Sequence, residues 1–232
     1  RNRMKILLVS SFLPYPLFSG GHIRLYNIVK GLSKNHDITL VCEKRDYQTK
    51  EDIKEIEKFC KKVITVDRKK QWTFSNIVKT FFSTNPFLIV GHTNGPLRQV
   101  ISQLLNIEKF DLIHVETSYI GQNIPRTDIP LVLVEHNIEY LVYERFVENA
   151  NLILMPLLRI DVKKLKLWEE KNWNKTTKLV AVSEVDRKIM GKIRKDVVIV
   201  SNGVDIDKFK VQSSKFKVTN GEKRVLFIGD FK

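Results

Sequence analysis

The sequence lacks most of the patterns that enzyme chemistries depend on. Only two cysteines occur, Cys42 and Cys60, and they form neither a C-x-x-C pair nor a set at metal-ligand spacing. We therefore expect no disulfide framework and no metal site, and the two thiols fit a reducing compartment. No G-x-S-x-G elbow, P-loop or H-E-x-x-H motif occurs, which disfavours chemistry by a protein nucleophile or a catalytic metal.

Long hydrophobic runs and the dinucleotide-binding glycine pattern are also missing. No stretch approaches the roughly 20 apolar residues that span a bilayer. The absence of G-x-G-x-x-G argues against a nucleotide-sugar epimerase or dehydrogenase. Apolar residues make up 43% of the 232 residues, as in ordinary globular proteins. The composition therefore predicts a globular domain with a buried core.

Acidic residues are few relative to basic ones. The sequence has 40 lysines and arginines against 26 acidic residues, a net charge of +14. This surplus favours an anionic partner, either a phosphorylated small molecule or an acidic lipid surface, unless another part of the protein offsets the charge. We expect no nucleic acid partner, because the basic residues are spread over many elements and no helix-turn-helix, RNP or zinc-finger pattern occurs.

Short apolar runs alternate with helical patterns along the chain. The runs do not alternate polar with apolar residues, which is typical of parallel strands buried on both faces. Between the first two, apolar residues from Leu25 to Leu32 recur at helical spacing, and Ser183 is placed to cap a later helix. The sequence predicts an α/β fold with a doubly wound, mostly parallel, Rossmann-like sheet. The runs are KILLVS, DITLVC, KVITV, DLIHVE, PLVLVE, KLVAVS and VVIVS.

Two helical segments carry apolar stripes next to lysines. The first runs from Trp72 to Phe82 and is dense in aromatic residues, and the second runs from Pro156 to Lys175. Each stripe either packs against the sheet or lies on an anionic membrane with its apolar side toward the lipid. Packing is the better interpretation for the second segment, and the two interpretations are balanced for the first.

Glycines and polar side chains follow the ends of strands, where open α/β sheets bind ligands. Gly20 and Gly21 lie in a long loop after the first run and directly before a helix. Bare backbone N–H groups at the start of a helix suit a phosphate, although a plain turn is an equally good interpretation. Arg24, one turn later, is placed to reach an anion or to pair on the surface.

Two later strands end in further candidates. His136 follows the run PLVLVE, and Asn137 and Glu139 beside it are placed to cap the next helix. In the run DLIHVE, the spacing of two directs His114 and Glu116 to the same side of the strand. Taken singly, each of these residues fits a structural role better than a catalytic one.

The last third of the sequence predicts the end of one domain and the start of another. A polar linker at 204–223 separates the run VVIVS from a new apolar run, VLFIGDF. We expect a first domain over 1–203, and at 224–232 the first strand of a second domain that the chain does not complete. On this interpretation the chain is half of a two-domain protein and is inactive alone.

In order and spacing, these pieces resemble the N-terminal domain of a group 1 glycosyltransferase. The resemblance is to the retaining family 4 type with two Rossmann domains, the glycosyltransferase-B (GT-B) fold, and it covers nearly the whole chain. Its most specific part is S-N-G-V-D-x-x-x-F at 201–209, which marks the hinge into the donor domain in that family. The other matching pieces are MKILLVSSFLPYPLFSGGHIRLYNIVKGLSKNHDITLVC, FDLIHVETSY, PLVLVEHNIEYLVYER, LVAVSEVDR and VLFIGDF.

The resemblance implies transfer of a sugar from a nucleotide-sugar donor to a glycan or lipid-linked acceptor, without a cofactor. It implies a cytoplasmic protein of polysaccharide or glycolipid assembly, with a peripheral position at the inner face of the membrane left open. His136 is implied as the catalytic residue. The implied substrate-binding residues are Gly20, Gly21, Arg24, Asn137 and Glu116. The alternative from another class is a non-catalytic α/β module that binds a phosphorylated ligand or an anionic membrane surface.

Overall fold

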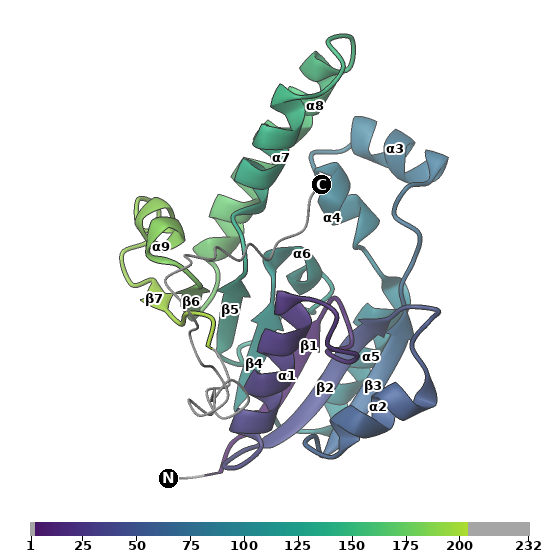
Figure 1. The fold of residues 1–232 in the computed structure, drawn as a ribbon, viewed down its shortest axis with the longest axis vertical. Coiled ribbons are helices and arrows are strands. Elements are labelled where there is room, and N and C mark those ends of the chain that lie inside the picture. The colour runs from purple at the N-terminus through teal and green to yellow at the C-terminus, as the bar shows by residue number, and fades with distance from the viewer. Residues whose placement is uncertain (1–2, 204–232) are drawn as a thin grey trace, which may run out of the picture. The chain divides into compact units, whose positions relative to one another are not determined.

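The computed structural model describes residues 3–203, so the expected linker at 204–223 and the expected strand at 224–232 lie outside it. Its first compact unit runs from Arg1 to Asn202 and contains a single seven-stranded sheet (Figure 1). The strands are β1 (Lys5–Ser10), β2 (Asp37–Lys44), β3 (Lys62–Asp67), β4 (Leu112–Glu116), β5 (Leu131–Glu135), β6 (Lys178–Ala181) and β7 (Val198–Ile199).

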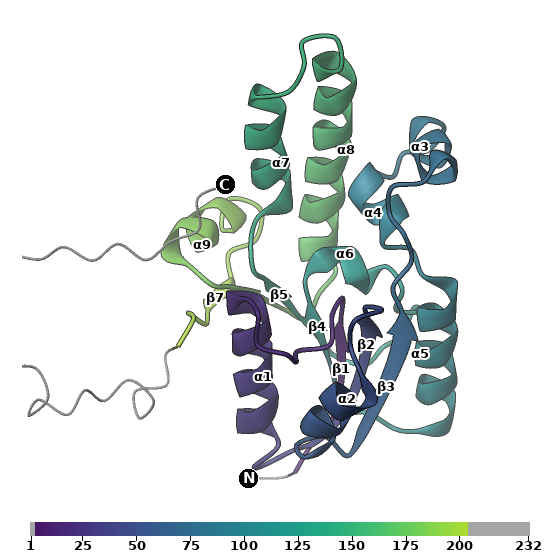
Figure 2. The same cartoon turned by 45° about the vertical axis from the view of Figure 1, so that its right-hand side comes forward.

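The helices of this unit cover both faces of the sheet and extend past its carboxyl edge (Figure 2). Ser183 caps α9 by accepting a hydrogen bond from the backbone N–H of Asp186, as the sequence predicts. The helices are α1 (Gly20–Leu32), α2 (Lys50–Glu57), α3 (Phe74–Phe81), α4 (Phe87–Gly91), α5 (Gly95–Ile107), α6 (Ser118–Gly121), α7 (Glu139–Glu148), α8 (Met155–Trp173) and α9 (Glu184–Met190).

All seven apolar runs are strands, and every neighbouring pair is parallel, so the doubly wound α/β fold is confirmed. The strand order is β3-β2-β1-β4-β5-β6-β7. From β1 the chain adds β2 and β3 on one side. It then crosses back to place β4 on the other side of β1, and β5, β6 and β7 follow outward from β4. The last residues of these two central strands, Ser10 and Glu116, are partners in the register. Open α/β sheets bind ligands at such a reversal of strand order.

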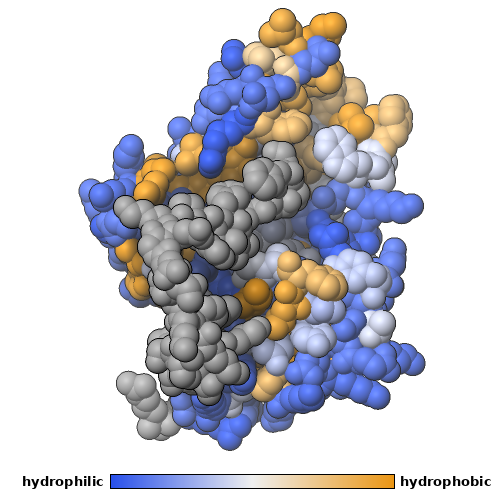
Figure 3. All heavy atoms as spheres, in the orientation of Figure 1, coloured by the Kyte–Doolittle hydropathy of each residue, from blue (hydrophilic) through white to orange (hydrophobic). Residues whose placement is uncertain are grey.

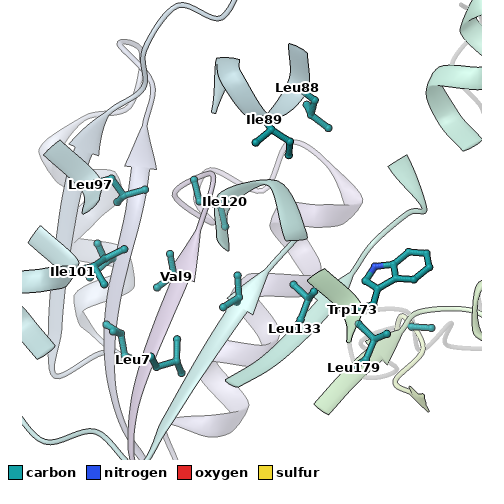
Figure 4. Packing of buried hydrophobic residues seen from close by; sticks show 14 of the residues in the cluster. Leu7, Val9, Leu88, Ile89, Leu97, Ile101, Ile120, Leu133, Trp173 and Leu179 are labelled. Carbon is teal, nitrogen blue, oxygen red and sulfur yellow. The ribbon is translucent and has the colours of Figure 1, made fainter. Parts of the chain in front are cut away.

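Successive residues of β1 enter different hydrophobic cores because strand side chains point alternately to the two faces. Leu7 and Val9 join the larger core, which also holds Trp173 of α8 (Figure 4). Leu8 joins the smaller core together with Leu25 of α1. All five side chains are fully buried. Because burying such a side chain is worth roughly 1.5–3 kcal/mol, packing on both faces holds the central strand ends in place.

The two stripe-bearing segments behave differently. In the second, α8, the C-terminal half packs on the core through Leu165 and Trp173, so the packing interpretation is confirmed there. In the first, α3, no residue is buried, and the helix packs against α4 instead of the sheet, so the packing interpretation is wrong for it. Both views show α3 and α4 at the same end of the sheet as the α7–α8 hairpin (Figures 1 and 2).

Candidate functional site

The polar strand-end residues meet at the carboxyl edge, at the point where the strand order reverses. Glu116 ends β4, and His136 is the first residue after β5, the neighbouring strand. The loop after β1 leads to Gly20 and Gly21 in the first turn of α1. The structure therefore brings together candidates that lie more than a hundred residues apart in the sequence.

Glu116 is the centre of this cluster. Its carboxylate is fully buried and accepts hydrogen bonds from Nε2 of His114, at 2.7 Å, and from Nε2 of His136. The expected common orientation of His114 and Glu116 is thereby confirmed. Burial alone would raise the pKa of Glu116, but the bonds and charges of the two histidines outweigh it and lower this pKa to about 2. An ionised carboxylate only accepts, so Nε2 of His136 carries a proton.

The other ring nitrogen of His136 faces the start of α1. A Cβ atom on Gly21 would lie 3.7 Å from Nδ1 of His136, whereas nothing lies within 4 Å of the same position on Gly20. Ser19 caps the helix by accepting a hydrogen bond from the backbone N–H of His22. The N–H groups of the first helical turn have no partner within the helix, and they point toward the helix end. Backbone donors and an imidazole thus border the same space.

Arg24 adds a positive charge to this edge. The half-buried guanidinium donates a hydrogen bond from Nη1 to Oδ1 of Asn202, at 2.9 Å. Burial lowers the pKa of Arg24, and the charge of Glu116 acts in the opposite direction. Asn202, which belongs to the S-N-G stretch at 201–203, therefore orients Arg24. In this position the guanidinium interacts electrostatically with Glu116.

The expectation that Asn137 or Glu139 caps the next helix is wrong. The N-cap of α7 is Ile138, no side chain caps it locally, and Asn137 is exposed. Glu169 of α8 takes over this role, because its carboxylate accepts from the backbone N–H groups of Glu139, at 3.0 Å, and Tyr140, at 2.8 Å. No local pattern could reveal this cap, since its acceptor lies about 30 residues away in the sequence.

A second buried carboxylate, Glu135 at the end of β5, forms hydrogen bonds to the segment that follows β4 and to α8. It accepts from the backbone N–H of Ser118, at 3.1 Å, and from the indole Nε1 of Trp173, at 3.0 Å. Thr117, between Glu116 and Ser118, has a positive φ of 74°, a strained conformation for a residue with a branched side chain. Glu135 thus holds the sharp exit from β4, and with it the orientation of Glu116.

The described residues contain no group of three or more side chains suited to hold a metal ion. The cluster instead offers a helix N-terminus and Arg24 for negative charge, together with an imidazole of fixed orientation. Phosphate binding and polar contacts to a hydroxyl-rich ligand are the chemistry that such groups serve. Glu135 and Glu169 are buried carboxylates that hold the surrounding backbone in place, and no local sequence pattern indicates either role.

The all-parallel sheet, its strand order and its site at the reversal define a Rossmann-like α/β protein of the kind that builds GT-B glycosyltransferases. The family model of Glycosyltransferase Family 4 matches residues 18–208, which is most of the chain. The chain belongs to this family, and the resemblance drawn from the sequence is confirmed.

Two solved structures share the fold. HepE from Anabaena, in complex with UDP and glucose, is 17% identical with a TM-score of 0.50, covering 91% of this chain and 48% of that one. A UGT from Medicago truncatula, complexed with UDP-glucose, is 12% identical with a TM-score of 0.52, covering 88% and 53%. The chain spans about half the length of these two proteins. Among curated proteins, none matches it.

Proposed function

We propose that the chain is the N-terminal, acceptor-side domain of a retaining glycosyltransferase. The enzyme would move a sugar from a nucleotide-sugar donor to a glycan or lipid-linked acceptor. The observation that carries this proposal is the approach of His136 Nδ1 to Gly21 at the first turn of α1, with the opposite ring nitrogen held by Glu116. The solved neighbours bind UDP together with glucose, or UDP-glucose, which supports a nucleotide-sugar donor here.

Each group in the site then has a chemical role. Negative charge grows on the diphosphate as the sugar leaves, and the N-terminal end of α1 at Gly20 and Gly21 favours that charge. Arg24 adds a second cationic contact. His136 presents Nδ1 to a sugar hydroxyl, because the hydrogen bond from Nε2 to Glu116 fixes the orientation of the ring. Asn137, exposed beside His136, is a further contact for the sugar or the acceptor.

In this proposal the donor is held mostly by a second domain, so residues 1–232 alone do not transfer sugar. No cofactor is required, because phosphate charge is met by the helix N-terminus and by side chains. Within residues 3–203, no helix has both the length and the apolar character needed to cross a bilayer. We propose a cytoplasmic enzyme of polysaccharide or glycolipid assembly that works at the inner face of the membrane.

The test is a transfer assay with the full-length gene product and a panel of UDP-sugars. His136→Ala should lower kcat by about 10²-fold, the usual cost of removing one preorganised group at a site where charge develops. His36→Ala is the matched control, because the imidazole of His36 accepts a hydrogen bond from the backbone N–H of Met4, before the start of β1 and at the opposite edge of the sheet from His136. Undiminished turnover by His136→Ala would contradict the proposed role. Failure of the full-length protein to use any donor, together with binding of a phosphorylated ligand, would favour a non-catalytic module.

A further inference from the structure

A large apolar groove opens beside the candidate site, between α3 and α4 on one side and α7 and α8 on the other. It encloses about 1180 Å³, more than the roughly 300–1,000 Å³ of pockets for drug-sized ligands. Much of the wall is exposed: Phe81 at 66%, Phe82 at 83% and Phe146 at 65%. Figure 3 shows hydrophobic residues gathered at the end of the molecule formed by these helices. Apolar surface of this extent marks a binding site.

Two charged side chains of the groove, Lys164 and Asp161, already form hydrogen bonds within the protein. The ammonium group of Lys164 donates to the backbone oxygens of Thr80 and Ser83, at 2.9 and 2.7 Å. The carboxylate of Asp161 accepts from the backbone N–H of Phe87, at 3.0 Å. A peptide in this groove would bury amide groups against a wall with few free hydrogen-bonding partners, which is costly. A hydrocarbon chain needs no such partners, so the wall favours a lipid tail.

A positively charged pocket adjoins the groove. It has a volume of about 370 Å³, and its charged lining residues are four cations, Arg45, Arg68, Lys69 and Lys70, and one acidic residue, Asp46. Trp72 lines both the pocket and the groove. Within residues 3–203, none of these four cations forms an ion pair. Burial and then the charge of Arg45 lower the pKa of Arg68, and the charge of Glu43 opposes them without reversing the shift. The pocket therefore holds like charges near one another, and a bound anion would relieve their repulsion.

The groove reaches the candidate site. Glu139, three residues after His136, lines the groove. Burial raises the pKa of Glu139 to about 6, and the charge of His136 acts in the opposite direction, so this end of the groove lies close to His136. The basic pocket joins the groove at Trp72.

We propose that the groove and the basic pocket bind a single phosphate-bearing lipid, its hydrocarbon chain between α3–α4 and α7–α8 and its phosphate at Arg45 and Arg68. This assigns a lipid phosphate as the acceptor class, and that assignment rests on the proposed glycosyl transfer. The binding itself does not depend on it. The occupant is one lipid molecule held in a groove, not the surface of a bilayer.

The test measures binding to the 232-residue chain, without donor or turnover. Farnesyl phosphate is the probe, and farnesol and inorganic phosphate supply the tail and the head separately. Calorimetry gives the affinities of the three ligands. Farnesyl phosphate should bind at least about tenfold more tightly than farnesol, because a hydrogen bond to a charged group contributes that much or more. Geranyl phosphate, with a shorter tail, should bind more weakly than farnesyl phosphate.

Matched variants separate the head from the tail. Arg68→Gln should weaken farnesyl phosphate about tenfold and leave farnesol unchanged, whereas Arg159→Gln on exposed α8 surface should change neither. Phe81→Ser should weaken both ligands, whereas Phe74→Ser should change neither, because Phe74 is exposed on the same helix but does not line the groove. Phe81 and Phe74 are both exposed, so neither change threatens the fold.

Two results would overturn the proposal. Equal affinities for farnesyl phosphate and farnesol would show that the basic pocket does not bind the phosphate. Equal losses in Phe81→Ser and Phe74→Ser, together with binding to phosphatidylglycerol vesicles, would mean that the helices lie on a membrane instead of enclosing a lipid. Transfer to a water-soluble glycan is measured separately, so the lipid site and the proposed transfer reaction can fail independently.

Discussion

Nδ1 of His136 lies 3.7 Å from the position that a Cβ atom on Gly21 would occupy. No backbone strain accounts for the glycine, because position 21 lies in the first turn of α1 and its φ is not positive. A side chain here would instead enter the space that the imidazole and the helix N-terminus border. The glycine thus keeps open the place where the proposed diphosphate meets His136.

Gly21→Ala should therefore separate folding from function. The melting temperature should stay the same or rise, because alanine favours a helix over glycine by roughly 0.5–1 kcal/mol. Transfer by the full-length protein should fall at least about tenfold, since small displacements of a reacting group are costly. Gly31→Ala, at the other end of the same helix with nothing within 4 Å, is the control and should keep full activity. Equal activity of the two variants would contradict the close approach.

Glu116→Gln should destabilise the fold in a pH-dependent way. The pKa of Glu116 is lowered from 4.5 to about 2 in the folded state, so the carboxylate adds stability above about pH 4.5 and loses it as the pH falls toward 2. At neutral pH the shift corresponds to about 3 kcal/mol. Urea denaturation of wild type and variant should show this difference at pH 7 and a smaller one near pH 3. A difference independent of pH would show that the lost bonds, not the charge, dominate.

Glu169→Gln should flatten the pH dependence of stability at higher pH. Burial, followed by the charge of Glu135, raises the pKa of Glu169 above its ordinary value of 4.5. The folded state then binds more protons than the unfolded state, so the free energy of unfolding falls as the pH rises above about 5. Between pH 5 and 8 the melting temperature should fall less steeply with rising pH for the variant than for wild type. Glu144→Gln, on exposed α7 surface, should follow wild type, and a wild-type slope in Glu169→Gln would contradict this account.

Arg24→Gln should weaken binding of the donor with little effect on the fold. The guanidinium is oriented by Asn202 and feels the charge of Glu116, so its loss removes a cation from the proposed diphosphate site. We expect KM for the nucleotide sugar to rise about tenfold, in line with loss of one hydrogen bond to a charged group. Lys30→Gln, exposed in the last turn of the same helix, is the control. A fall in kcat at constant KM would instead assign Arg24 to the transition state.

The sequence predicts the sheet well because each strand is a local, continuous apolar run, and Ser183 is placed as a cap by neighbours only a few residues away. It predicts His136, Gly21 and Glu116 as members of one edge, because carboxyl ends of parallel strands lie together. It does not predict that Glu169 caps α7 or that Glu135 holds Trp173. These pairings join distant segments, and nothing in either local sequence distinguishes the buried carboxylates from exposed ones.

The cap that Glu169 supplies to α7 has a mechanical consequence. The loop of His136 and Asn137 connects β5 to α7, and the first turn of α7 is fixed to α8 by two hydrogen bonds. Residues of the same two helices form one wall of the apolar groove. The helix pair that lines the groove is therefore joined to β5 through only three residues, 136–138, and the first of them is the histidine of the candidate site.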